Sequence, residues 1–251
     1  LAWCVPGWRC RIECWTPWAA LPALLLGLGG AQGVSVQLDA VLFGTVLALD
    51  GTRRVFLAFT ALLWLGAGLY SRGTLAGDAR ASGFRLLWLA TMAGNFGLIL
   101  AQDLASFYAS FALMSFAAYG LVIHDRSGAA LNAGRVYLAM AASASAAPQA
   151  PLLSDLAGAI AASPRRDLTI ACLVAGFGVK AGLPLLHMWL PLAHPVAPVP
   201  ASAVLSGAMI KAGLLGWLVT LPLGVVALPG WGLGLITLGF AAAFGAAAIG
   251  I

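Results

Sequence analysis

Long runs of mostly apolar residues follow one another along almost the whole chain, and few charged residues interrupt them. A helix that crosses a membrane needs about 20 mostly apolar residues. Of the 251 residues, 62% are hydrophobic and only 8% are charged, whereas about a quarter of the residues of a soluble domain are charged. Disordered segments need low hydrophobicity, and the strands of an outer-membrane barrel alternate apolar with polar residues. The sequence therefore predicts an all-α polytopic membrane protein.

Nine apolar stretches are candidate spans, and we expect seven or eight of them to cross the membrane. They are 15–30, 34–49, 55–70, 84–101, 104–123, 136–162, 168–190, 201–223 and 228–251. The stretch 34–49 is weak because Gln37 and Asp39 interrupt it, and 136–162 is ambiguous because it contains two prolines. The chain divides into weak N-terminal spans over 1–50, a transmembrane core over 51–223 and the start of a further helix over 224–251.

Arginines in the loops indicate how the spans are oriented. Alternation puts the loops after 55–70 and after 104–123 on one side, and these loops carry Arg72, Arg80, Arg85, Arg126 and Arg135. Basic loops mark the cytoplasmic side. The location that we expect is the bacterial inner (plasma) membrane, crossed several times. Asp103 falls on the opposite side and is predicted to cap the helix that follows it. The pairs Arg53-Arg54 and Arg165-Arg166 conflict with this scheme.

No motif in the sequence points to an active site within this chain. It has no glycine-rich nucleotide loop, no cluster of metal ligands and no nucleophile–base pair, so we expect neither a cofactor nor a metal. Three cysteines near the start, Cys4, Cys10 and Cys14, match no common zinc spacing, and their role stays open. The net charge is +5, but no basic run exceeds two residues, so nucleic acid is not an expected partner.

Two lysines lie deep inside apolar spans. Lys180 stands about twelve residues into 168–190 and Lys211 about ten residues into 201–223, which places both near the middle of the bilayer. A charge at that depth costs about 3 kcal/mol on insertion scales, and such residues mark ion or proton pathways. We predict a proton pathway through both lysines. The alternative is a lysine paired with a carboxylate for packing, which needs a partner chain because no Asp or Glu lies at mid-span.

A proline and two histidines follow the first lysine. Pro184 removes the helical hydrogen bond to the Lys180 carbonyl and predicts a broken or kinked helix. A broken helix with an ionisable residue at the break is typical of a transporter site. His187, seven residues after Lys180, is a candidate next proton carrier. His194 is placed at the mouth of the pathway, either for proton uptake or as an ordinary polar loop residue.

The segment around both lysines resembles a known family. It reads Gly176-Phe-Gly-Val-Lys180-Ala-Gly-Leu-Pro184-Leu-Leu-His187-Met-Trp-Leu-Pro191, then His194-Pro-Val-Ala-Pro198-Val-Pro200, Ser202-Ala, Ser206-Gly and Lys211-Ala-Gly. The pattern is similar to antiporter-like subunits of respiratory complex I, of Mrp-type sodium/proton antiporters, and of membrane-bound hydrogenases and formate hydrogenlyase. The resemblance implies two inverted five-helix repeats, each with a broken helix, and redox chemistry in other subunits.

The resemblance also implies roles for individual residues. Lys180 matches the central proton carrier on the broken helix, Lys211 matches the lysine that passes protons toward a second half-channel, and His187 and His194 match histidines of the motif. The family has a glutamate on the helix that corresponds to 104–123, where it pairs with the broken-helix lysine. Ala112 stands at that position and can neither carry charge nor accept a proton.

Two functions from different classes follow from these observations. The first is a membrane-arm subunit that carries protons through a half-channel centred on Lys180 and Lys211, driven by a partner enzyme. The second is a structural subunit of such a complex that no longer pumps, which Ala112 favours. Because only about one span follows Lys211, we do not expect the second inverted repeat within this sequence. Expected partners are other membrane subunits, the lipid bilayer, and protons or sodium ions, and the sequence leaves the complex itself open.

Overall fold

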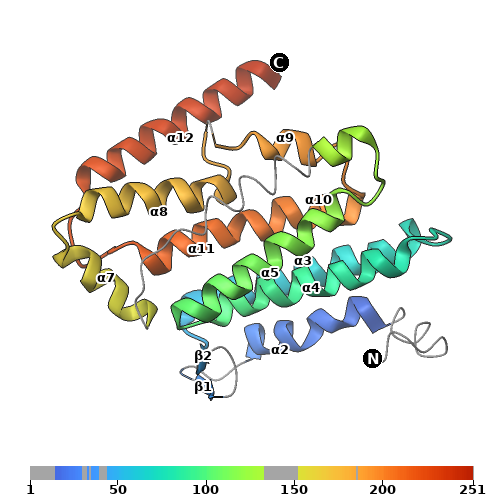
Figure 1. Cartoon of the computed structure of the whole chain (residues 1–251), viewed down its shortest axis with the longest axis horizontal. Coiled ribbons are helices and arrows are strands. Elements are labelled where there is room, and N and C mark those ends of the chain that lie inside the picture. Colours follow the sequence, from blue (N-terminus) through green and yellow to red (C-terminus); the bar gives the residue numbers. More distant parts are fainter. Residues whose placement is uncertain are drawn as a thin grey trace.

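The computed structural model of the chain describes residues 15–29, 33, 35–39, 44–132, 152–184 and 186–250, so Cys4, Cys10 and Cys14 lie outside the described residues. Most of the described chain is helical, as the apolar runs predict (Figure 1). The elements in chain order are η2 (Thr16–Ala20), α2 (Leu21–Gly29), β1 (Ser35–Leu38), β2 (Thr45–Ala48), α3 (Gly51–Thr74), α4 (Ala81–Leu100), α5 (Leu104–Val122), α7 (Leu153–Ala162), α8 (Arg166–Ala181), α9 (Trp189–Ala193), α10 (Val199–Val204), η3 (Leu205–Met209), α11 (Ile210–Thr220) and α12 (Pro229–Gly250).

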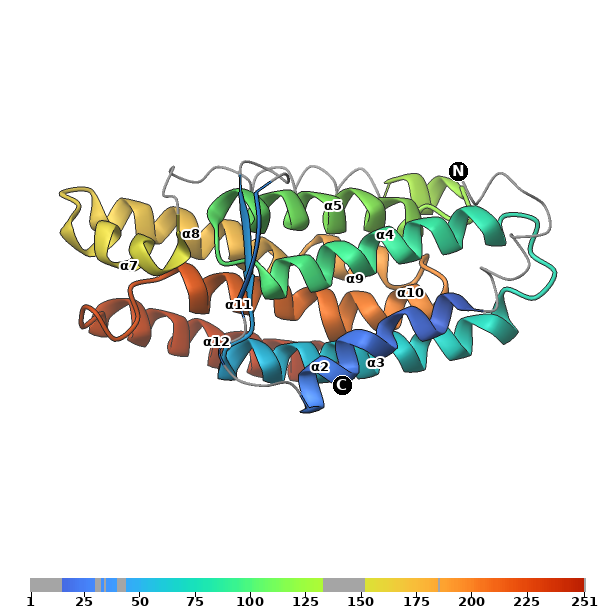
Figure 2. The same ribbon diagram turned by 90° about the horizontal axis from the view of Figure 1, so that it is seen from below.

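Five helices among the described residues are long and apolar enough to cross a membrane. They are Gly51–Thr74, Ala81–Leu100, Leu104–Val122, Val199–Thr220 and Pro229–Ala248. The long helices run in a common direction and their connections lie at the two ends of the bundle (Figure 2). The chain is therefore a multi-pass membrane protein, while the expected total of seven or eight spans stays a prediction.

The expected weak span over 34–49 is wrong. Its described residues form two antiparallel strands, with Ser35 opposite Ala48 and Leu38 opposite Thr45. Gly44 adopts the left-handed backbone conformation at φ = 98°, which favours a turn over a helix. The β-branched side chains of Val36 and Thr45 suit a strand, and the polar residues that weaken the apolar run lie on the exposed first strand or directly after it.

Helices α4 and α5 form a closely packed antiparallel pair, which lies beside α3 (Figures 1 and 2). The contact depends on a glycine, because a Cβ atom at Gly94 would lie 2.5 Å from the backbone nitrogen of Met114. Small residues of this kind let membrane helices approach closely. A polar contact joins α3 to the pair, since the indole nitrogen of Trp64 donates to Asn95 Oδ1 over 3.1 Å. Both side chains are buried.

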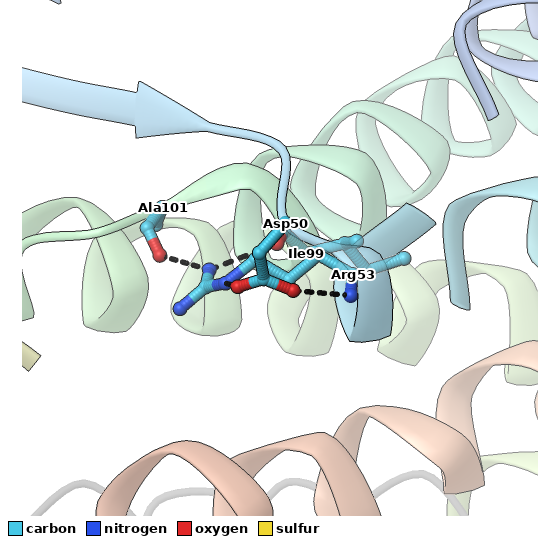
Figure 3. Close-up of polar contacts among 4 residues, drawn as sticks. All are labelled: Asp50, Arg53, Ile99 and Ala101. Atoms are coloured by element: carbon cyan, nitrogen blue, oxygen red, sulfur yellow. Dashed lines mark hydrogen bonds and ion pairs between the residues drawn. The ribbon is translucent and has the colours of Figure 1, made fainter. Parts of the chain in front are cut away.

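A buried arginine connects the start of α3 to the junction of α4 and α5 (Figure 3). Arg53 is 3% exposed, and its guanidinium donates to Asp50 Oδ2 over 3.0 Å, to the carbonyl of Ile99 over 2.9 Å and to the carbonyl of Ala101. The two carbonyls lie at the end of α4, where no helical N–H is left to satisfy them. Arg53 is thus engaged in a structural contact, which explains why this arginine does not follow the orientation expected from loop charges, whereas nothing in the structure explains Arg54.

Asp103 caps α5, as the sequence predicts. Its carboxylate accepts from the backbone N–H of Ser106 over 2.7 Å and from that of Val46 over 2.9 Å. Burial alone would raise the pKa of Asp103, but these hydrogen bonds to the charged form outweigh burial, and the pKa lies below its usual value. The same carboxylate therefore starts a helix and holds the hairpin against it.

The opposite end of the bundle is closed by a loop contact. Asp78, between α3 and α4, lies 2.7 Å from His124 Nε2 at the end of α5, and the guanidinium of Arg80 donates to the His124 carbonyl over 2.9 Å. The contact confirms that the two arginine-bearing loops lie on the same side. Two hydrogen bonds lower the pKa of Asp78. The larger effect comes from the backbone N–H of Arg80, and the smaller from the side chain of His124.

This lowered pKa predicts a pH dependence of stability. Because the folded chain holds Asp78 ionised more firmly than the unfolded chain does, its contribution is complete above the ordinary aspartate pKa and disappears as the pH falls through the folded value, below about 4. We expect the unfolding temperature of Asp78→Asn to fall less than that of the wild type as the pH is lowered over this acidic range. Thermal unfolding in detergent measures the effect, with the exposed neighbour Asp125→Asn as control. Equal acid profiles in wild type and Asp78→Asn would contradict it.

Candidate functional site: a lysine at a broken helix

The predicted helix break is present. Helix α8 ends at Ala181, and Gly182 follows in the left-handed conformation at φ = 78°, which ends helices in the way that glycine allows. Pro184 comes two residues later, and the chain resumes as the short helix α9. The prediction from sequence assigned the break to Pro184 alone and missed Gly182, although a glycine just before a proline is a recognisable signal for the end of a helix.

Lys180 lies in the last turn of α8, beside the break, and is 2% exposed. Its ammonium nitrogen is 3.4 Å from Ser115 Oγ of α5. Two aromatic rings flank it, with ring centres 5.8 Å away in Phe111 and 5.7 Å away in Trp189. The partial negative charge at the C-terminal end of a helix and the faces of aromatic rings both favour a cation. The Lys180 ammonium is therefore buried at the end of α8, against side chains of α5 and α9.

Trp189 holds the resumed chain against the end of α8. Its indole nitrogen donates to the Val179 carbonyl over 2.6 Å, and its side chain is 1% exposed. The bond satisfies a carbonyl next to Lys180 at the position where the helix stops. Neither Trp189 nor Ser115 was predicted from the sequence. Trp189 is the only tryptophan in the motif, but nothing in the one-dimensional pattern shows that Ser115 of α5 faces it.

The two candidate histidines differ in their surroundings. His187 lies between the break and α9, and its Nδ1 is buried and makes no hydrogen bond within the described part of the chain. His194 ends α9, and its Nδ1 is 2.6 Å from the hydroxyl of Ser202 in α10. The hydrogen bond of His194 ties the resumed segment to the next helix, whereas the ring of His187 keeps one nitrogen uncommitted at the break.

Lys211 has a different setting from Lys180. It lies at the start of α11, directly after the π-helical turn η3, and lines an open groove of about 680 Å³ against α3. Gly213 lies on the face of α11 that packs against α8, because a Cβ atom at this position would lie 2.5 Å from the backbone nitrogen of Ala181. Two residues correspond to about 200° around a helix, so Lys211 emerges on the side away from α8. The structure does not bring the two lysines into one pocket.

The groove beside Lys211 is mainly apolar. It is lined by Phe59, Leu62 and Tyr70 of α3 and by Val199 and Ala203 of α10, among others. No hydrogen bond or ion pair of the Lys211 ammonium occurs among the residues that the structure describes. π-Helical turns inside α-helices frequently lie at functional sites, and η3 was not foreseen from the sequence.

Two proteins of similar sequence are named as a component of a hydrogenase and as a subunit of an antiporter. Hydrogenase-4 component B of Escherichia coli is 31% identical over 186 residues, which cover 68% of this chain and 27% of that protein. A probable K⁺/H⁺ antiporter subunit of Rhizobium meliloti is 34% identical over 190 residues, covering 68% of this chain and 34% of that protein. This chain thus spans only about a third or less of the length of these two relatives.

Solved structures show the same fold. A chain of the membrane-bound sulfane sulfur reductase, an archaeal respiratory membrane complex, matches with a TM-score of 0.69 and 24% identity over 87% of this chain and 38% of that one. A chain of the Mrp complex from Dietzia sp. matches with a TM-score of 0.65 and 21% identity over 82% of this chain and 41% of that one.

The family described as "NADH:quinone oxidoreductase/Mrp antiporter, TM" matches residues 101–251, more than half of the chain. The matched region contains α5, the broken helix with Lys180, and Lys211. It therefore includes every residue of the motif that carries the resemblance in the sequence. This chain belongs to the NADH:quinone oxidoreductase/Mrp antiporter membrane family, with the partial antiporter-like fold that the resemblance predicts.

Proposed function

We propose that this chain is a proton-translocating subunit of a multisubunit complex in a bacterial inner membrane, with a half-channel centred on Lys180 and Lys211. Relatives named as a hydrogenase component, an antiporter subunit and a NADH-quinone oxidoreductase subunit support a place beside other membrane subunits. The energy for transport comes from a partner in the complex, because the sequence contains no active-site motif of its own.

The observation that carries the proposal is the surroundings of the Lys180 ammonium. A proton carrier must be tolerated both with and without its proton. The Ser115 hydroxyl, 3.4 Å away, can accept a hydrogen bond from the ammonium and can donate one to the neutral amine. The rings of Phe111 and Trp189 favour the charged form, while burial favours the neutral form. These opposing effects suit a group that gains and loses a proton.

The groups near the break extend the pathway on either side of Lys180. Backbone that leaves the helix at membrane depth is tolerated where it faces protein or a wet cavity. His187 lies at this break. Its Nδ1 is buried and makes no hydrogen bond to the described residues, so the ring can take part in proton exchange with Lys180. Lys211, on the far side of α11, extends the pathway toward the groove beside α3. Since Lys180 and Lys211 occupy separate settings, the transfer between them requires intervening carriers.

A structural subunit that does not pump is the second candidate, and Ala112 favours it. Ala112 stands on α5 one residue after Phe111 and three residues before Ser115, both of which contact the Lys180 ammonium. Residues three apart are neighbours on a helix face, so a glutamate at position 112 would lie beside Ser115 and near the Lys180 ammonium. An alanine there cannot supply the proton-accepting carboxylate of the family pattern.

Proton flux in vesicles distinguishes the two candidates. The full chain, reconstituted with the subunits that co-purify with it, is expected to acidify vesicles under an imposed membrane potential above the level of vesicles without it. Ala112→Glu is expected to raise this flux several-fold, because the carboxylate adds a second proton-binding group beside Lys180. Ala112→Gln is the matched control, with similar size but no titration. Normal assembly with no flux in either wild type or Ala112→Glu would overturn the proposal and establish the structural role.

A further inference from the structure

A cationic pocket lies at the arginine-bearing end of the bundle, and none of the residues proposed for transport lines it. It lies where α4 begins and α5 ends, has a volume of about 300 Å³, and is lined by Arg80, Gly83, Phe84, Leu87, Gly120, Ile123, His124 and Arg126. The charged side chains in this lining are all basic. Asp78 is not part of the lining, and its carboxylate lies 2.7 Å from His124 Nε2. We propose that this pocket binds the phosphate of an anionic phospholipid headgroup.

The position of the pocket favours a lipid as the ligand. Helices α4 and α5 are both long and apolar enough to span a membrane, and the pocket lies at the ends of both, where helices of this length reach the headgroup region. Below it, Leu86 and Phe116 are exposed on the outer surface of the same two helices, at 53% and 60%. Phe116 lies one helical turn below Gly120, so an apolar surface for acyl chains continues from the cationic pocket. Basic pockets between membrane helices commonly bind anionic headgroups.

Local backbone features keep the pocket open. Nothing lies within 4 Å of the position where Gly83 would carry a Cβ atom, so no side chain fills the pocket on that side. Arg126 adopts a positive φ of 52°, which is uncommon for a residue with a side chain. Its side chain is exposed and makes no hydrogen bond to the described residues, whereas Arg80 is already bonded to the His124 carbonyl. Arg126 is thus the guanidinium that is available to a phosphate.

Lipid binding by the purified full chain tests the proposal. In detergent micelles or nanodiscs, phosphatidylglycerol is expected to bind more tightly than phosphatidylcholine, which carries the same phosphate but no net charge. Arg126→Asn is expected to weaken phosphatidylglycerol binding about fivefold, the effect of one surface arginine on an anionic lipid. Asparagine tolerates a positive φ, so this variant keeps the local backbone. Arg72→Gln, an exposed arginine at the same end but outside the pocket, is expected to bind as wild type.

Three results would overturn the proposal. One is equal binding of phosphatidylglycerol and phosphatidylcholine. Another is equal weakening by Arg72→Gln and Arg126→Asn, which would show general surface attraction. The third is full competition by inorganic phosphate at the affinity of the lipid, which would make this a site for free phosphate. The proton flux of Arg126→Asn is not the readout, so failure here leaves the proposed transport function separately testable.

Discussion

Lys180→Met is expected to lower proton flux by at least about tenfold, which corresponds to about 1.4 kcal/mol in the barrier for transfer. Methionine fills much of the same space but can bind no proton. The neighbouring side chains of Phe111, Ser115 and Trp189 stay in place, because none of them is changed. A neutral side chain also removes the cost of burying an ammonium, so folding and assembly are expected to be unharmed. Flux into vesicles, measured with a pH-sensitive dye, gives the result.

A second substitution separates charge from proton exchange. Lys180→Arg keeps a positive charge, but a guanidinium does not release its proton at accessible pH. Flux is therefore expected to fall in Lys180→Arg as in Lys180→Met. Flux retained in Lys180→Met, with normal assembly, would remove Lys180 from the pathway. Flux retained in Lys180→Arg alone would show that the site needs a fixed charge rather than a proton carrier.

Arg53→Met is expected to destabilise the fold by about 2–4 kcal/mol, the largest stability effect that we predict for a single side chain. The variant leaves the carbonyls of Ile99 and Ala101 without the guanidinium that now satisfies them, at the buried end of α4 (Figure 3). It also removes the ion pair with Asp50, which contributes little because Asp50 is 55% exposed. The expected result is a lower unfolding temperature in detergent.

The adjacent arginine provides a matched control. Arg54 carries the same charge on the same helix, is partly exposed, and makes no side-chain hydrogen bond within the described part of the chain. Arg54→Met is therefore expected to change stability by less than about 0.5 kcal/mol. If both variants lost the same stability, the carbonyl contacts of Arg53 would not be the cause, and a general effect of charge at this end of the bundle would account for the loss.

Local chemistry was sufficient to predict several features of the fold. The apolar length of 84–101 and 104–123 predicted α4 and α5, because spanning a bilayer depends on composition over a single segment. The cap at Asp103 and the break after Lys180 were also predicted correctly, since a side chain that accepts backbone N–H groups and a proline in a helix act on residues within one turn. The hairpin at 35–48 was missed because its short apolar strands have the composition of a weak span.

The sequence by itself determined that this chain lies in a membrane, that its helix breaks beside a lysine, and which family it belongs to. Only the tertiary structure decided what each charge contacts. It placed Ser115 and Trp189 around Lys180. It put Lys211 on the side of α11 that faces away from α8, and it buried Arg53 against two carbonyls. The physical reason is that hydropathy and helix breaks depend on near neighbours in the chain, whereas a buried charge is stabilised by groups that are distant in sequence.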